Sequence, residues 1–117
     1  MSDFKEKRGM SRVRRKVIYG RSVIFVCSPD DPEVSISKAR GAYLDRGFHL
    51  ENLKFVENIS PFSPRETARS VHILHDCDGM FVCSAAADDI KCRVEIEYAR
   101  FMDMAITWED PSENIFT

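Results

Sequence analysis

The residues best suited to chemistry lie late in the chain, where four carboxylates occur close together. Asp88 and Asp89 stand in a loop of small and acidic residues, and Glu95 and Glu97 lie in the first turns of the helix expected to follow. Residues two apart on a helix point in different directions, so only one of these glutamates can face a crevice. Glu95 is the better placed, and a carboxylate near a helix start is favoured in its ionised form, which suits a nucleophile. We therefore take Glu95, with Asp89 six residues earlier, as the candidate catalytic pair.

Two patterns of apolar residues alternate along the chain, one typical of strands and one typical of helices. They predict the elements that position this pair. Residues 23–27 and 80–83 are continuous apolar runs, which are typical of strands covered on both faces of a parallel sheet. Residues 31–33 supply a capping aspartate, a proline and an acid, which together open a helix, and Gly47 ends it. Residues 63–66 form a capping box that opens a second helix, which continues to about residue 75.

A third helix is predicted over residues 90–104, with short strands at residues 53–59 and 106–108. The resulting alternation of strands and helices predicts a small α/β domain, a flavodoxin-like or Rossmann-like open parallel sheet flanked by helices. The apolar residues expected to face the sheet from the first helix are Ile36, Ala39, Tyr43 and Leu44. Those expected to do so from the third helix and the residues after it are Val94, Tyr98, Phe101, Met102 and Ala105.

In such sheets, ligands bind beyond the carboxyl ends of the strands, where the strand order reverses. The turn after residues 23–27 contributes Ser28, Pro29 and Asp31 to that edge, and the loop after residues 80–83 contributes Ser84. Lys91 follows that loop and offers a positive charge. We expect these five residues to contact the substrate.

Residues 79–100, GMFVCSAAADDIKCRVEIEYAR, resemble the signature of the nucleoside 2-deoxyribosyltransferase family and of its compact bacterial and phage relatives of unassigned function. The shared pattern is a cysteine-aspartate pair (here Cys77-Asp78), an apolar strand, a short loop and a glutamate at a helix start, which is Glu95 here. The apolar strand at residues 23–27 and the Ser28-Pro29 turn after it are similar to the opening of these domains. The resemblance covers residues 22–108.

The resemblance implies cleavage or transfer at the N-glycosidic bond of a nucleoside or nucleoside monophosphate, with Glu95 attacking C1′ and Asp89 holding the sugar or assisting. Such a bond breaks through an oxocarbenium-like transition state, which a carboxylate stabilises and then captures covalently. Asp89 and Lys91 stand where phosphate-handling relatives carry Ser-x-Gly; an aspartate there repels phosphate, and Lys91 offsets it. Three interpretations stay open: an N-glycosidase or deoxyribosyltransferase, a non-catalytic nucleotide or nucleotide-sugar binding module acting as a sensor or sponge, and a pair that merely caps a helix.

The composition excludes a disordered chain and a membrane-spanning protein. The chain has 117 residues, of which 44% are hydrophobic and 31% charged, as expected of a globular domain, and no apolar run is long enough to cross a bilayer.

Residues 1–21 carry eight basic and two acidic side chains, although the net charge of the whole chain is −2. We interpret residues 1–21 as a basic arm, partly disordered or forming an edge strand. Residues 22–108 then form the α/β domain, and residues 109–117 a tail.

The expected partners and location follow from the same features. The chain contains four cysteines, Cys27, Cys77, Cys83 and Cys92, and none lies two residues from another, so the paired-cysteine metal pattern is absent. We expect reduced thiols, a cytoplasmic protein, and neither a metal nor an organic cofactor. The expected partners are a nucleoside or nucleotide and further copies of the chain in a dimer or higher oligomer. Contact with nucleic acid is expected only through the basic arm, and none is expected with a membrane.

Overall fold

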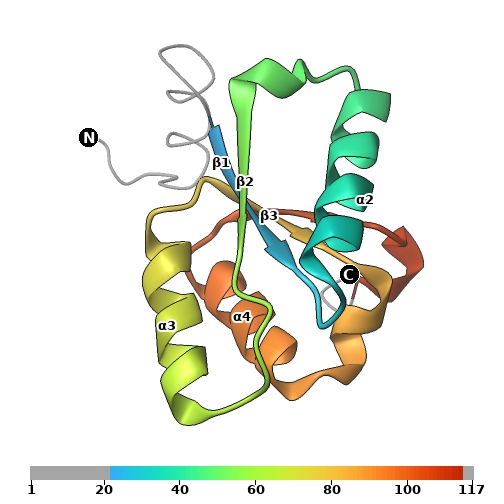
Figure 1. Cartoon of the computed structure of the whole chain (residues 1–117). Coiled ribbons are helices and arrows are strands. Elements are labelled where there is room, and N and C mark those ends of the chain that lie inside the picture. Colours follow the sequence, from blue (N-terminus) through green and yellow to red (C-terminus); the bar gives the residue numbers. More distant parts are fainter. Residues whose placement is uncertain (1–21, 115–117) are drawn as a thin grey trace.

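The computed structural model describes residues 22–114, which form one sheet of four parallel strands in the order β2-β1-β3-β4 (Figure 1). The strands are β1 Ser22–Cys27, β2 Leu53–Glu57, β3 Gly79–Val82 and β4 Ala105–Trp108. The α-helices in the described residues are α2 Pro32–Asp45, α3 Pro64–His75 and α4 Ile90–Phe101. This architecture confirms the predicted open parallel α/β sheet. The predicted arm, residues 1–21, and the last three residues of the predicted tail lie outside the described residues.

Alternate residues of β1 enter two hydrophobic layers, one on each side of the sheet. Ile24 and Val26 pack in the layer that contains α2, whereas Phe25 and Cys27 pack in the layer that contains residues of α3 and α4. Helix α2 therefore covers one face of the sheet, and α3 and α4 cover the other (Figure 1). Burial on both faces is why residues 23–27 are apolar without interruption.

The predicted start and stop signals are present at the helix ends. The Asp31 side chain accepts a hydrogen bond from the Val34 amide at 3.3 Å, and the Ser63 hydroxyl accepts one from the Glu66 amide at 3.0 Å. Gly47 follows α2 with a φ of +89°, a backbone conformation that glycine adopts without steric cost. The expected inward position of Leu44 is wrong, since this side chain is 58% exposed.

Helix α4 buries a different face from the one predicted. Its buried residues are Lys91, Cys92, Glu95, Ile96 and Ala99. Val94 and Ala105 are exposed, Phe101 is 84% exposed, and Tyr98 and Met102 are only partly buried. The helix also ends earlier than predicted, at Phe101, and Asp103 adopts a φ of +60° in the turn before β4. The prediction was wrong because it took the apolar residues of α4 as the inward face and placed Glu95 and Lys91 at an edge open to the substrate. Opposite charges four residues apart can instead neutralise each other and be buried together.

The strand order places a topological switch between β1 and β3. The chain moves from β1 through α2 to β2 on one side, and then returns through α3 to β3 on the other side of β1. The chain leaves the carboxyl end of β1 through α2 toward β2, and it leaves the carboxyl end of β3 through α4 toward β4, in the opposite direction. In folds of this type, the loops that diverge in this way open a crevice between them. The loops after β1 and β3 therefore border the expected ligand site.

Candidate functional site

Hydrogen bonds between loop residues shape the carboxyl edge at the switch point. The Ser28 hydroxyl accepts hydrogen bonds from the Asp30 amide at 3.0 Å and from the Ser35 hydroxyl at 2.8 Å, which tightens the turn into α2. The Ser84 amide donates to the Glu109 carboxylate at 2.8 Å, which ties the loop after β3 to the end of β4. Both predicted serines thus lie at the same edge.

The charges at this edge are mainly negative. Asp30, Asp31 and Asp88 are exposed in the loops, and the Glu109 carboxylate lies 3.7 Å from the Lys38 ammonium. Such an edge disfavours a phosphate and suits hydroxyl groups, which donate hydrogen bonds to carboxylates.

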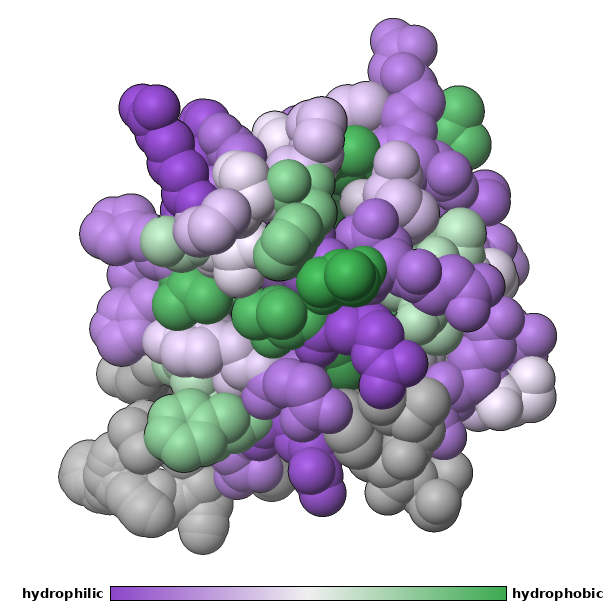
Figure 2. Space-filling view, turned by 90° about the horizontal axis from the view of Figure 1, so that it is seen from below, coloured by the Kyte–Doolittle hydropathy of each residue, from purple (hydrophilic) through white to green (hydrophobic). Residues whose placement is uncertain are grey.

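Exposed apolar side chains also gather on this side of the molecule. In a parallel sheet each helix begins near the carboxyl end of the strand before it, and Val34, Phe62, Ile90 and Val94 lie in or just before the first turns of helices and are exposed. Seen from below, toward the starts of α3 and α4, the surface shows hydrophobic residues near its middle with hydrophilic residues beside them (Figure 2). We call Val34, Phe62, Ile90 and Val94 the apolar rim.

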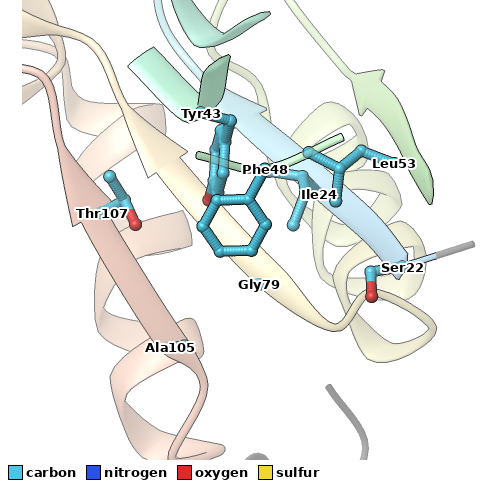
Figure 3. A pocket seen from close by; sticks show the side chains of 8 residues that line it. All are labelled: Ser22, Ile24, Tyr43, Phe48, Leu53, Gly79, Ala105 and Thr107. Carbon is cyan, nitrogen blue, oxygen red and sulfur yellow. The ribbon is translucent and has the colours of Figure 1, made fainter. Parts of the chain in front are cut away.

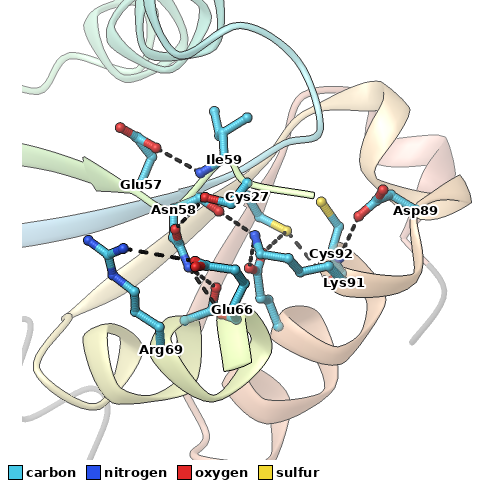
Figure 4. Close-up of polar contacts among 12 residues, drawn as sticks. Cys27, Glu57, Asn58, Ile59, Glu66, Arg69, Asp89, Lys91 and Cys92 are labelled. Atoms are coloured by element: carbon cyan, nitrogen blue, oxygen red, sulfur yellow. Dashed lines mark hydrogen bonds and ion pairs between the residues drawn. The ribbon is translucent and has the colours of Figure 1, made fainter. Parts of the chain in front are cut away.

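The predicted nucleophile, Glu95, lies below this surface in an ion pair. The Glu95 side chain is 1% exposed and that of Lys91 2% exposed, and the Lys91 Nζ lies 2.9 Å from Glu95 Oε2. Lys91 also donates to the backbone carbonyl of Asn58, which directly follows β2 (Figure 4). The ammonium group predicted to offset a substrate phosphate is therefore engaged with two protein oxygens inside the fold.

Asn58 is a part of the site that the sequence analysis missed. It is buried, and its side-chain amide donates to the Glu66 carbonyl at 3.1 Å and to the Ser70 hydroxyl at 2.9 Å. These bonds fix the backbone after β2 against α3, so that its carbonyl points at Lys91 (Figure 4). Asn58 falls within the strand predicted over residues 53–59, whereas β2 ends at Glu57, so the predicted boundary gave no signal for it.

Two thiols complete the surroundings of Glu95. The Cys27 sulfur lies 3.3 Å from Glu95 Oε1 and 3.6 Å from the Cys92 carbonyl oxygen. Burial, together with the neighbouring Cys92 and Glu95, raises the pKa of the Cys27 thiol well above its ordinary value, so the thiol stays protonated. All four cysteines are free and buried.

Asp89 has a separate task in the structure. Its carboxylate accepts a hydrogen bond from the Cys92 amide at 2.9 Å, which caps the start of α4 (Figure 4). Asp89 thus lies at the amino terminus of α4, whereas Glu95 is buried six residues further on, near the middle of the helix. The predicted substrate residues Pro29 and Asp31 are more open to solvent, in the turn after β1.

A pocket of about 100 Å³ lies at the opposite edge of the sheet, where the strands begin (Figure 3). Tyr43 and Phe48 border it from the end of α2, and Gly79 and Ala105 from the starts of β3 and β4. Burial raises the pKa of the Tyr43 hydroxyl above its ordinary value. Among the described residues, the lining offers no carboxylate or cation for catalysis, so the polar edge is the better candidate site.

Comparisons of the chain with family models, curated proteins and solved structures gave no match. In the part of the chain that the structure describes, no helix is both long and apolar enough to span a membrane.

Proposed function

We propose that the protein is a nucleoside-binding module that holds its ligand at the carboxyl edge between β1 and β3 without cleaving it. The observation that carries this proposal is the buried pair of Lys91 and Glu95. A carboxylate that is 1% exposed and held at 2.9 Å by an ammonium group cannot reach the C1′ atom of a sugar at the surface. In the conformation described, the edge is therefore suited to binding rather than to catalysis.

The chemistry of the edge supports a nucleoside as the ligand. Val34 and Phe62, the residues of the apolar rim that lie outside α4, give a base a hydrophobic contact. Stacking on the Phe62 ring, which is 53% exposed, contributes about 1–3 kcal/mol per base. The carboxylates of Asp31 and Glu109 can accept hydrogen bonds from sugar hydroxyls. The same negative charges favour an unphosphorylated nucleoside over its monophosphate.

Cleavage or transfer at the N-glycosidic bond, with Glu95 as the nucleophile, is the second candidate. It is favoured by the place of Glu95 near the carboxyl end of β1, where its oxygen contacts the sulfur of the last β1 residue, Cys27. The carboxylate would form a bond to C1′ while the bond to the base breaks. The base would leave with the bonding electrons and take up a proton, and water or a second base would resolve the glycosyl ester. This route requires Lys91 to release Glu95 and Asp89 to release its cap.

One experiment separates these functions. The full chain is incubated with a panel of nucleosides and their 5′-monophosphates, its melting temperature is measured, and free base is measured by chromatography. We expect a nucleoside to raise the melting temperature, by an amount corresponding to about 2.7 kcal/mol at 100 times its dissociation constant, without release of base. Base release that disappears in Glu95→Gln would support the second candidate, and the absence of both effects would exclude both.

A matched pair of variants locates the ligand. Phe62→Ala removes an aromatic ring from the apolar rim, whereas Phe48→Ala removes one from the pocket at the opposite edge. If the base stacks on Phe62, the first substitution weakens binding about 5- to 150-fold, and the second leaves it unchanged. The reverse result would place the ligand in the other pocket.

We also propose that two copies associate through the outward face of α4. Ile90, Val94 and Phe101 are exposed along this face, and Tyr98 packs its ring against that of Phe101, with centroids 6.5 Å apart. A two-fold axis across the middle of α4 would bring this stripe against itself. Arg93 and Glu97 also lie toward solvent and are four residues apart. In an antiparallel pair of helices, Arg93 of each copy would therefore pair with Glu97 of the other copy.

A cytoplasmic location is likewise a proposal, supported by the four free thiols.

A further inference from the structure

Three potential metal ligands that are distant in the chain converge beneath the carboxyl edge. Cys27 ends β1, and Cys92 and Glu95 lie three residues apart on the inward face of α4. Their ligand atoms, two sulfurs and one carboxylate oxygen, all lie within 4.8 Å of one another, and all three side chains are buried. The two sulfurs face each other across the gap between β1 and α4 (Figure 4). The spacing of cysteines along the chain could not indicate this cluster, because the fold brings its members together.

Lys91 orients the carboxylate in this cluster. Glu95 Oε2 accepts a hydrogen bond from the Lys91 ammonium at 2.9 Å, and Glu95 Oε1 lies 3.3 Å from the Cys27 sulfur. One oxygen is thereby fixed to a cation, and the other is directed toward the two thiols. Charged or hydrogen-bonded groups behind a ligand commonly hold it in this way in metal sites.

From this arrangement we propose that Cys27, Cys92 and Glu95 bind a divalent thiophilic cation of the zinc type, with Lys91 as the positioning residue behind the carboxylate. Two thiolates and one carboxylate match the sulfur and oxygen donors that zinc accepts. Three protein ligands leave one tetrahedral position for a small molecule such as water. The proposal does not depend on nucleoside binding.

The charge balance favours a divalent ion. With both thiols protonated, the charges of Glu95 and Lys91 cancel, so the cluster is neutral. When a divalent cation binds, each thiol loses its proton to solvent, and the two thiolates balance the two charges of the ion. The cluster is again neutral, which avoids the cost of an uncompensated buried charge. A monovalent ion with both thiolates would leave one negative charge.

The test uses Co²⁺ as a spectroscopic probe on the full chain, freed of metal and kept reduced with a phosphine. We expect one Co²⁺ per chain, a sulfur-to-cobalt charge-transfer band with the intensity of two thiolates, visible bands of tetrahedral coordination, and release of two protons per ion in unbuffered solution. Zn²⁺ should displace the cobalt and abolish the visible bands. The proton count is made on the unaltered protein, so it does not depend on a variant that folds.

Cysteine variants supply the controls. Cys27→Ser and Cys92→Ser should each remove half of the charge-transfer intensity and weaken Co²⁺ binding at least tenfold, whereas Cys83→Ser, on the other face of the sheet, should change neither. Circular dichroism establishes that each variant is folded. Absence of the charge-transfer band in the unaltered protein, or a band that survives in the Cys27→Ser/Cys92→Ser variant, would overturn the proposal.

Discussion

Replacing Lys91 by methionine tests the buried ion pair that closes the candidate site. Methionine keeps the length and apolar stem of lysine but removes the ammonium group. Glu95 is then left as a charge without its cation, and removal of one partner of a buried pair costs about 3–5 kcal/mol. The Asn58 carbonyl also loses its donor from Lys91, which costs about 1–3 kcal/mol more.

This loss is large for a small domain. Domains of this kind unfold with a total free energy of about 5–15 kcal/mol, so Lys91→Met removes about a third of the stability or more. The double variant Lys91→Met/Glu95→Leu leaves no buried charge, and apolar replacement of a whole buried pair is often neutral or stabilising. We therefore expect the double variant to be more stable than the single variant, although it carries one more substitution.

Urea denaturation followed by tryptophan fluorescence measures these differences. Trp108 is the single tryptophan of the chain and is buried against the core, so its emission reports unfolding of the sheet. Lys38→Met is the matched control, because Lys38 pairs with Glu109 at the surface, where such pairs contribute about 0.2–1 kcal/mol. A Lys91→Met variant as stable as Lys38→Met, or a double variant less stable than Lys91→Met alone, would refute the reasoning.

Three further predictions concern other parts of the structure. Asp89→Ala removes the cap of α4 and should lower the free energy of unfolding by about 1 kcal/mol; a thermal melt of unchanged midpoint would contradict this. Burial raises the pKa of the Cys27 and Cys83 thiols above the ordinary 9.0, so the folded state keeps protons that the unfolded state loses. The free energy of unfolding should therefore fall above pH 9, by up to about 1.4 kcal/mol per pH unit for each thiol, and the urea midpoint should fall with it. Midpoints that rise from pH 9 to pH 10 would count against that burial. Phe101→Glu, in the exposed stripe of α4, should convert a dimer to a monomer in light scattering without lowering the melting temperature of the monomer; an unchanged mass would exclude this face as the interface.

The fold could be predicted because its signals are local. Residues 23–27 and 80–83 are apolar without interruption, and the caps at Asp31 and Ser63 mark where helices begin. Gly47 marks where α2 ends, through its positive φ. Each signal depends on neighbours in the chain, so no knowledge of the tertiary structure is needed.

The site could be predicted only in part, because its decisive contacts are not local. The stripe of Val94 and Phe101 and the stripe of Cys92, Glu95 and Ile96 both recur at helical spacing, and the apolar residues of the first made it the apparent inward face. Which stripe is buried depends on the Lys91 ammonium, which pairs with Glu95 and also reaches a carbonyl beyond β2, 33 residues earlier. The sequence could place Glu95 on α4, but it could not indicate that Glu95 is buried in an ion pair with Lys91.

A single NMR titration tests the central claim, that the carboxyl edge binds a nucleoside while Lys91 keeps Glu95 out of reach. Isotope-labelled protein is titrated with the nucleoside that most raises the melting temperature, and the amide spectrum and the signals of free base are followed in the same tube. We expect shifts of the amide signals of Ser28, Ser84 and Ile90, unchanged amide signals of Ile24 and Ala105, and no free base after prolonged incubation. Free base accumulating in the tube, or shifts confined to the pocket at the amino ends of the strands, would contradict it.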